Sequence, residues 1–170
     1  MSDKPWDGRF SESTYKLVEA FTSSIDIDKR LYSYDIEGSI AHCKMLAKTE
    51  IITEEDALSM IQGLGKIKRE IERGQFQFDD SLEDIHMHIE TRLVNEVGKA
   101  AQKLHTARSR NDQIALDMRM FLKDETHHII QSLVEFQYVL VKLAKTHPDM
   151  ILPGYTHMQR AQPVLFSHHL

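Results

Sequence analysis

Two polar stretches of the sequence hold residue types that could bind a substrate carrying several carboxylates. The first, Leu104–Gln113, reads LHTARSRNDQ. It contains two guanidinium groups, a hydroxyl, an amide and a carboxylate at consecutive positions: Arg108, Ser109, Arg110, Asn111 and Asp112. Guanidinium groups form paired hydrogen bonds with carboxylates, which suits such a substrate. The same residues also suit a solvated loop that caps a helix, with Ser109 or Asn111 as N-cap, and this stretch alone favours the cap.

The second stretch, Gly154–Pro163, reads GYTHMQRAQP and changes that balance. Thr156 and His157 are adjacent in a turn bounded by Gly and Pro, where a hydroxyl and an imidazole can face one cavity. Gln159, Arg160 and Gln162 add hydrogen-bond donors. Pro163 is expected at the first-turn position of a last helix, whose N-terminus would favour anions.

One long helix is expected between the two stretches, because the segment from Ile114 to His147 has almost no helix breakers. It should begin at Ser109 and end before His147-Pro148. Its apolar seam comprises Ile114, Met118, Phe121, Leu122, Ile129, Leu133, Phe136, Leu140 and Leu143. A helix on the order of 50 Å long cannot bury such a seam inside a monomer of this size. Partner helices must come from a missing part of the chain or from other subunits.

Four shorter helices are expected before the long one, over residues 12–22, 29–48, 53–74 and 81–98. Tyr15, Val18 and Phe21 (or Leu17) should face inward in the first helix. In the third, Thr53 is the expected N-cap, Leu58 is expected in the buried stripe and Gly74 ends the helix. A polar arm over residues 1–10 precedes them all.

The fourth helix carries His86 and His88 two residues apart. These positions diverge by about 200° on a helix, so the pair cannot chelate one metal ion from a continuous helix. His86 lies beside the apolar stripe. It either projects into a cleft at the helix edge or is a rim histidine bonded to Glu83 or Glu90.

Composition narrows the class of protein. The chain has 170 residues, 41% of them hydrophobic and 28% charged, enough for a packed core. Only 7 Gly and 4 Pro favour helices over a loop-rich fold. A net charge of -5 without a basic stripe argues against nucleic acid as a partner. The single cysteine, Cys43, excludes an internal disulfide and a Cys-based zinc site. No apolar run reaches the ~20 residues that span a bilayer, and no signal-peptide core is present, so we expect a cytoplasmic protein.

The two stretches, separated by a long helix, resemble the argininosuccinate lyase family, in the superfamily of fumarases and aspartases. Shorter matches occur in order along the chain: Gly8-Arg9-Phe10, the SIDIDKRL segment from Ser24 to Leu31, Asp35–Ser39 and Glu83–His86. One position departs from the pattern. Ala107 stands where the family usually has Gly, so the backbone there must suit a Cβ or be strained by about 1 kcal/mol.

The resemblance implies an all-α fold. Residues 1–108 would form an N-terminal helical domain, and residues 109–170 the incomplete start of a central helical bundle. Family members work as homotetramers, with a twenty-helix bundle and active sites built from three subunits. They split argininosuccinate into arginine and fumarate by β-elimination, without metal or organic cofactor. The chain stops at Leu170 without a helix-end signal, so we expect an N-terminal portion that lacks the family's mobile loop and its catalytic serine.

The resemblance also assigns site residues. His157 and Thr156 would serve acid–base chemistry and substrate contact, while Asn111 and Ser24 would bind substrate. Arg110, Ser109 and His86 would line the same site. Removing a proton beside a carboxylate builds negative charge, which fixed donors stabilise. The departing guanidino nitrogen needs a proton, and His is the usual donor.

Two other classes remain open. The first is a non-catalytic protein of the same descent, such as a lens crystallin recruited from this enzyme, which can keep these motifs. The second is a sister lyase acting on adenylosuccinate, aspartate or malate. The Ser109–Asp112 sequence SRND is characteristic of the argininosuccinate branch and argues against the second class.

Overall fold

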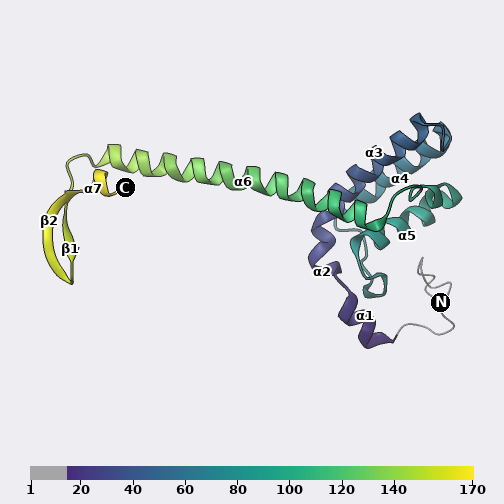
Figure 1. The fold of residues 1–170 in the computed structure, drawn as a ribbon, viewed down its shortest axis with the longest axis horizontal. Helices are drawn as coiled ribbons and strands as arrows, with labels where there is room; N and C mark the ends of the chain where they lie inside the picture. Colours follow the sequence, from purple (N-terminus) through teal and green to yellow (C-terminus); the bar gives the residue numbers. More distant parts are fainter. Residues whose placement is uncertain (1–14) are drawn as a thin grey trace. The chain divides into compact units, whose positions relative to one another are not determined.

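The structure is a computed structural model and describes residues 15–170. Helices form most of this range, and one two-stranded antiparallel sheet lies between the last two of them (Figure 1). The mainly helical fold is confirmed, although the sheet was not predicted. In chain order the elements are α1 (Lys16–Thr22), α2 (Ile25–Asp28), the 3-10 helix η2 (Lys29–Leu31), α3 (Tyr32–Lys48), α4 (Glu54–Glu72), η3 (Asp80–Leu82), α5 (Ile85–Val97), η4 (Gly98–Lys103), α6 (Arg110–Thr146), β1 (Ile151–Thr156), β2 (Gln159–Leu165) and α7 (Phe166–His169).

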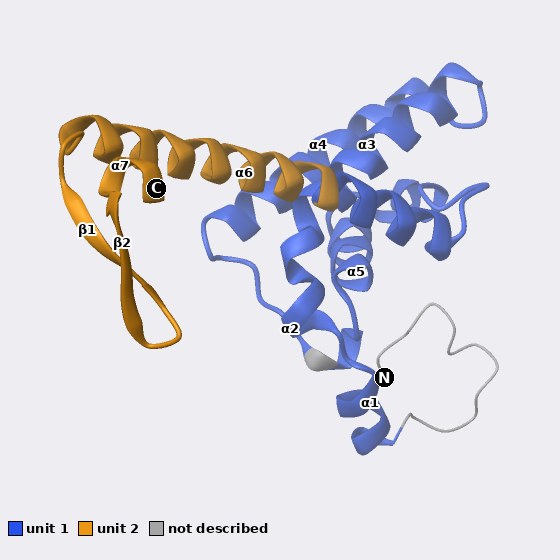
Figure 2. Ribbon diagram, turned by 60° about the vertical axis from the view of Figure 1, so that its left-hand side comes forward, with its two compact units in different colours: residues 1–121 blue, residues 122–170 orange. Residues whose placement is uncertain are grey.

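The chain divides into two compact units, with the division between Phe121 and Leu122 (Figure 2). Helix α6 begins in the first unit and ends in the second, so we describe each unit by itself. The expected domain boundary between residues 108 and 109 stays a prediction. Among the described residues, no helix is both long and apolar enough to cross a membrane.

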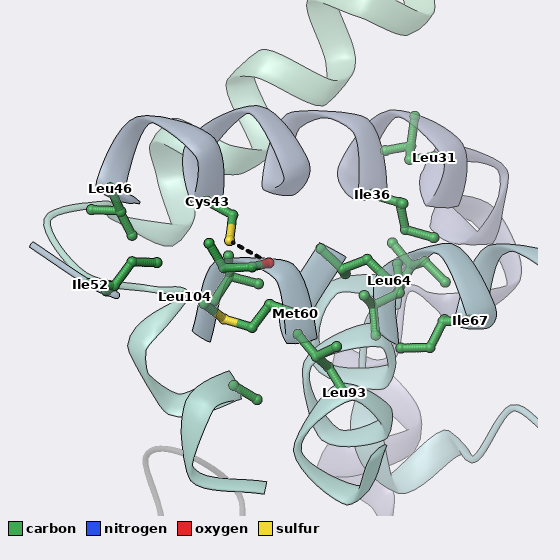
Figure 3. Close-up of a cluster of buried hydrophobic side chains, with 14 of the residues drawn as sticks. Leu31, Ile36, Cys43, Leu46, Ile52, Met60, Leu64, Ile67, Leu93 and Leu104 are labelled. Carbon is green, nitrogen blue, oxygen red and sulfur yellow. Dashed lines mark hydrogen bonds between the residues drawn. The ribbon is translucent and has the colours of Figure 1, made fainter. Parts of the chain in front are cut away.

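The core of the first unit lies between α3, α4 and α5, with side chains from the loop after η4 added (Figure 3). Its fully buried apolar side chains include Ile36, Leu46, Met60, Leu64, Ile67, Ile85 and Leu93. Thr53 caps α4 as predicted, because its Oγ1 accepts a 3.1 Å hydrogen bond from the Asp56 amide. Gly63 brings α4 close to α5: a Cβ there would lie 2.7 Å from Leu93 Cδ1.

Two predictions about buried faces are wrong. Helix α1 has no buried residue, and Tyr15, Leu17, Val18 and Phe21 are all exposed. The helix has 7 residues, and α2 begins only three residues after it ends, so α1 is too short to form its own packed face. Leu58 of α4 is 59% exposed. The expected polar arm and the first residues of the expected first helix lie outside the described range.

Helix α6 has 37 residues and confirms the predicted long helix. The second stretch folds differently from the prediction. Pro163 does not begin a helix but pairs with Pro153 in the β1–β2 hairpin. Each strand of a two-stranded sheet is an edge, where a proline without an N–H is tolerated. The last helix, α7, begins at Phe166 instead.

Candidate active-site elements

Three helices of the first unit meet at a buried polar cluster. Asp35 of α3, His86 of α5 and Asp117 of α6 have side chains only 1–3% exposed. His86 Nδ1 lies 3.1 Å from Asp35 Oδ1 and 3.5 Å from Asp117 Oδ2. His86 is therefore an interior residue bonded to a carboxylate of another helix. The interpretation of His86 as a rim histidine bonded to Glu83 or Glu90 is therefore wrong, because the ring is buried and pairs with Asp35.

The cluster holds protons near neutral pH. Burial, followed by the charge of Asp35, raises the pKa of Asp117 from 3.8 to about 7. Burial alone would lower the pKa of His86, but the hydrogen bond and charge of Asp35 outweigh it and raise that pKa above 6.5. Both carboxylate oxygens of Asp117 are buried without a hydrogen-bond partner among the described residues, which fits a carboxyl group that is often neutral.

The same three side chains are the described residues that could hold a metal ion. Their possible ligand atoms all lie within 4.8 Å of one another. The positive charge of Arg108, however, already acts on both Asp35 and Asp117. Because the pKa values of His86 and Asp117 are both raised, a divalent ion would have to displace the protons that these groups hold, next to the positive charge of Arg108. We therefore interpret the cluster as one that holds protons.

Gln113 connects this cluster to the start of α6. Its Nε2 donates to Asp35 Oδ1, and its Oε1 accepts a 2.9 Å hydrogen bond from Arg110 Nη1. The other guanidinium nitrogen, Arg110 Nη2, donates to Glu90 Oε2 at 2.5 Å. Gln113 is 4% exposed. The guanidinium group of Arg110 is thus held between an amide of its own helix and a carboxylate of α5.

Ser109 precedes α6 and serves as its cap. Its Oγ accepts a 3.1 Å hydrogen bond from the backbone N–H of Asn111. Its own backbone N–H donates to Asp112 Oδ2 at 3.0 Å. This reciprocal pair satisfies backbone donors at the helix start. The cap interpretation is therefore correct for Ser109. Asn111 is not the cap but the second residue of α6, and it is exposed. Ala107 lies just before this cap with a φ of 56°, in the left-handed region that favours glycine.

A pocket lies beside these residues. The polar side chains that line it are Asp35, Ser39, Glu90, His105, Arg108, Arg110 and Gln113. Arg108 donates to Ser39 Oγ at 3.3 Å, and its buried Nε has no hydrogen-bond partner among the described residues. Burial, followed by the charge of Arg110, lowers the pKa of His105, so this ring is neutral at pH 7. The pocket has a volume of about 10 Å³, which is room for about one water molecule beside these polar groups.

Ser24 lies where α1 gives way to α2 and is half-buried. Its Oγ donates to Asp28 Oδ2 at 2.6 Å, and Asp28 Oδ1 accepts a 3.1 Å hydrogen bond from the Ile85 amide. The Ser24 amide also donates to the Glu83 carbonyl at 2.8 Å. Ser24 is therefore attached to the start of α5, next to His86.

Thr156 and His157 belong to the second unit, at the tip of the hairpin. Thr156 Oγ1 lies 2.9 Å from His157 Nδ1, so hydroxyl and imidazole are hydrogen-bonded as neighbours. The turn residues His157 and Met158 have φ values of 50° and 58°. Two successive positive φ values are typical of a type I′ hairpin turn. Both side chains of the predicted acid–base pair are exposed.

The structure brings some of the predicted site residues together in the first unit. Arg110 and His86 are linked through Gln113 and Asp35, and Ser109 and Asn111 occupy the cap beside Arg110. Thr156 and His157 lie in the other unit. Sequence reasoning missed the connecting residues Asp35, Gln113 and Asp117. A weak signal was present, because Gln113 and Asp117 are four residues apart and therefore share one helix face.

Known proteins resemble this chain over nearly its whole length. The Lyase family matches residues 8–170. The chain is 61% identical to an argininosuccinate lyase of Desulfatibacillum aliphaticivorans, over 98% of this chain and 36% of that protein. It is 54% identical to an argininosuccinate lyase of Syntrophotalea carbinolica, over 100% of this chain and 37% of that protein. The chain therefore spans little more than a third of the curated relatives it matches.

Two solved structures are similar in fold. A crystal structure of EDDS lyase in complex with formate matches with a TM-score of 0.69 and 29% identity, over 82% of this chain and 27% of that one. A fumarate lyase from Mesorhizobium sp. BNC1 matches with a TM-score of 0.63 over 92% of this chain and 37% of that one. At 19% identity, the second likeness concerns the fold alone.

Proposed function

The chain belongs to the Lyase family, and from this we propose that it contributes to an argininosuccinate lyase, which cleaves argininosuccinate to arginine and fumarate by β-elimination. The observation that carries the proposal is the 61% identity to an argininosuccinate lyase over 98% of the chain. Because the chain spans about a third of such relatives, the proposed activity is that of the complete enzyme.

The start of α6 supplies what the elimination requires at the substrate's carboxylates. Arg110 donates one N–H of Nη1 to Gln113 and one N–H of Nη2 to Glu90. Three of its five N–H donors are left for substrate. The exposed amide of Asn111 and the hydroxyl of Ser109 lie in the same helical turn. Negative charge that builds on a carboxylate would be stabilised by these donors and by the positive end of α6.

The proton chemistry is assigned to the hairpin. We propose His157 as the acid–base residue and Thr156 as its orienting and substrate-contacting neighbour, supported by the 2.9 Å contact between them. Ser24 is the proposed hydroxyl ligand near α5. His86 completes the set, and because its ring is enclosed by Asp35 and Asp117, its effect on substrate would pass through Gln113 and Arg110.

The assembly and the setting belong to the same proposal. We infer a homotetramer, because α6 carries a row of large exposed apolar side chains that include Leu122, Ile129, Leu133 and Phe136. Partner helices would cover this seam. The reaction needs no metal or organic cofactor, and we place the enzyme in the cytoplasm, in arginine biosynthesis, without nucleic-acid or membrane partners.

The test is a chimeric enzyme in which this chain replaces the matching segment of the Desulfatibacillum aliphaticivorans argininosuccinate lyase. We expect the chimeric enzyme to release fumarate from argininosuccinate, which is measured by the absorbance of fumarate. The variant Asn111→Ala should raise KM by about 10- to 100-fold, since hydrogen bonds to charged groups have that strength. The matched variant Ser132→Ala, at an exposed position of α6, should leave KM unchanged.

The same assay separates the alternatives. EDDS, adenylosuccinate, aspartate and malate are tested beside argininosuccinate, because a solved EDDS lyase is 29% identical to the chain. A preference for any of these substrates would place the protein among the sister lyases. A folded chimeric enzyme without turnover would indicate a non-catalytic, crystallin-like protein.

A further inference from the structure

Helix α6 is anchored to the first unit by two polar side chains. Gln113 and Asp117 are the buried residues of this 37-residue helix as the structure describes it. They are one turn apart on the same face. Gly38 of α3 makes room for that face, because a Cβ at Gly38 would lie 3.0 Å from Leu116 Cδ2 and 3.6 Å from Asp117 Oδ1. The α6 start is therefore held by the hydrogen bonds of Gln113 and by the burial of Asp117 beside His86, together with apolar contacts such as that of Phe121 with Tyr34.

The amide of Gln113 can bond in only one direction. Asp35 is a carboxylate and accepts, whereas the Arg110 guanidinium only donates. The Gln113 side chain gives its Nε2 to the first and its Oε1 to the second. A flipped amide would set donor against donor and acceptor against acceptor, so these two partners determine the orientation. Asp35 is itself held by His86.

We propose that Gln113 is a positioning residue for the substrate: it holds the Arg110 guanidinium, opposite Glu90, so that the remaining N–H donors face a substrate carboxylate. The inference rests on the proposed function, in which Arg110 contacts argininosuccinate. A long arginine side chain that is already ordered loses less conformational entropy when substrate binds. Gln113 itself is buried and linked to Arg110, and it acts through that residue.

The first test is Gln113→Met in the chimeric enzyme, since Met has a similar length but no amide. We expect KM for argininosuccinate to rise about 10- to 100-fold, the range for a hydrogen bond to a charged group, while kcat changes far less. Gln62→Met, at an exposed position of α4, is the matched control and should change neither constant.

A double-mutant cycle with Arg110→Met tests the route of the effect. If Gln113 acts through Arg110, the double variant Gln113→Met with Arg110→Met has the same KM as Arg110→Met alone. Independent effects that multiply would overturn the positioning role. A purely structural contribution of Gln113 would produce that second result, because loss of helix anchoring does not require Arg110.

A second variant, Gln113→Glu, covers the case in which Gln113→Met does not fold. Glu keeps an acceptor for Arg110 but cannot donate to Asp35 and adds a like charge beside it. It should lower the unfolding temperature yet keep KM within about threefold, the scatter of independent effects. A rise in KM as large as that of Arg110→Met contradicts the proposal. If the unmutated chimeric enzyme has no turnover, the proposed function and this inference both fail; if it has turnover, the variants decide the inference alone.

Discussion

Ala107 is the residue where sequence and backbone conflict most directly. Its φ of 56° is in the left-handed region, where a Cβ is strained by about 1–2 kcal/mol per residue. Ala107→Gly in the chimeric enzyme should therefore raise the free energy of unfolding by about 1 kcal/mol, measured by thermal or denaturant unfolding. Ala115→Gly, at an exposed position inside α6, should lower it by about 1 kcal/mol instead. Equal effects of the two variants would mean that Ala107 is not strained.

His157 carries the proposed proton transfer, and its test is kinetic. His157→Asn should lower kcat about 10²–10⁴-fold and change KM much less, because general acid–base groups act in the transition state. Asn keeps a polar group next to Thr156 but does not titrate. Steady-state rates of the chimeric enzyme give both constants. An unchanged kcat would remove His157 from the chemistry.

At the residue scale, the capping residues could be predicted and the buried charges could not. Thr53 and Ser109 were candidate caps because hydroxyls before a helix satisfy backbone amides. No sequence pattern indicates that Asp35 and Asp117 share a buried cluster, since carboxylates are seldom buried without a partner. Their partner, His86, lies 51 residues from Asp35 in sequence, and no local pattern indicates that pairing.

At the scale of elements, apolar spacing predicted α3 to α6 well and failed for the hairpin. The turn at His157 and Met158 needs two positive φ values, yet neither residue is the Gly, Asn or Asp that usually indicates such a turn. Pro153 and Pro163 also read as helix and loop boundaries rather than as paired strand residues. The strands are therefore specified by their pairing more than by their composition.

The junction of α3, α5 and α6 should make stability depend on pH. Asp117 has a pKa of about 7 when folded and 3.8 as its ordinary value, so the folded state binds the extra proton between these values. Stability contributed by this proton is lost as pH rises through that range. His86, whose pKa is raised above 6.5, acts in the same direction. The unfolding temperature of the chimeric enzyme should therefore fall between about pH 4 and 7.

The variant Asp117→Asn is the control for this dependence, because an amide has similar size and cannot titrate. Its unfolding temperature should vary less over the same pH range than that of the unmutated enzyme. The other groups facing the cluster are Asp35, Arg108, Glu90 and His105, all left intact by this change. A pH dependence that is unchanged in Asp117→Asn would show that the junction is not its source.

At the scale of the whole molecule, the part of α6 in the second unit has an apolar seam that is largely exposed. Leu122, Ile129, Leu133 and Phe136 are 54–60% exposed. A large apolar side chain contributes about 1.5–3 kcal/mol when it becomes buried, so several together favour association strongly. Monomer surfaces normally expose single apolar residues, whereas a continuous apolar row of this kind marks an interaction surface. The seam is the observation on which the proposed tetramer rests.

The 170-residue chain by itself should therefore self-associate and release no fumarate from argininosuccinate. Self-association follows from the seam, and sedimentation measures it. Ile129→Lys with Phe136→Lys should reduce the association, because two charges interrupt the apolar face, whereas Gln131→Lys, at an exposed polar position of α6, should not. Inactivity is expected because the proposed mechanism needs a proton acceptor besides His157, and residues 151–165 of the hairpin contain no carboxylate. Adding the remaining segment of the Desulfatibacillum aliphaticivorans enzyme as a separate polypeptide should restore part of the activity by covering the seam. A folded monomer, or turnover by the chain alone, would contradict this account of the molecule.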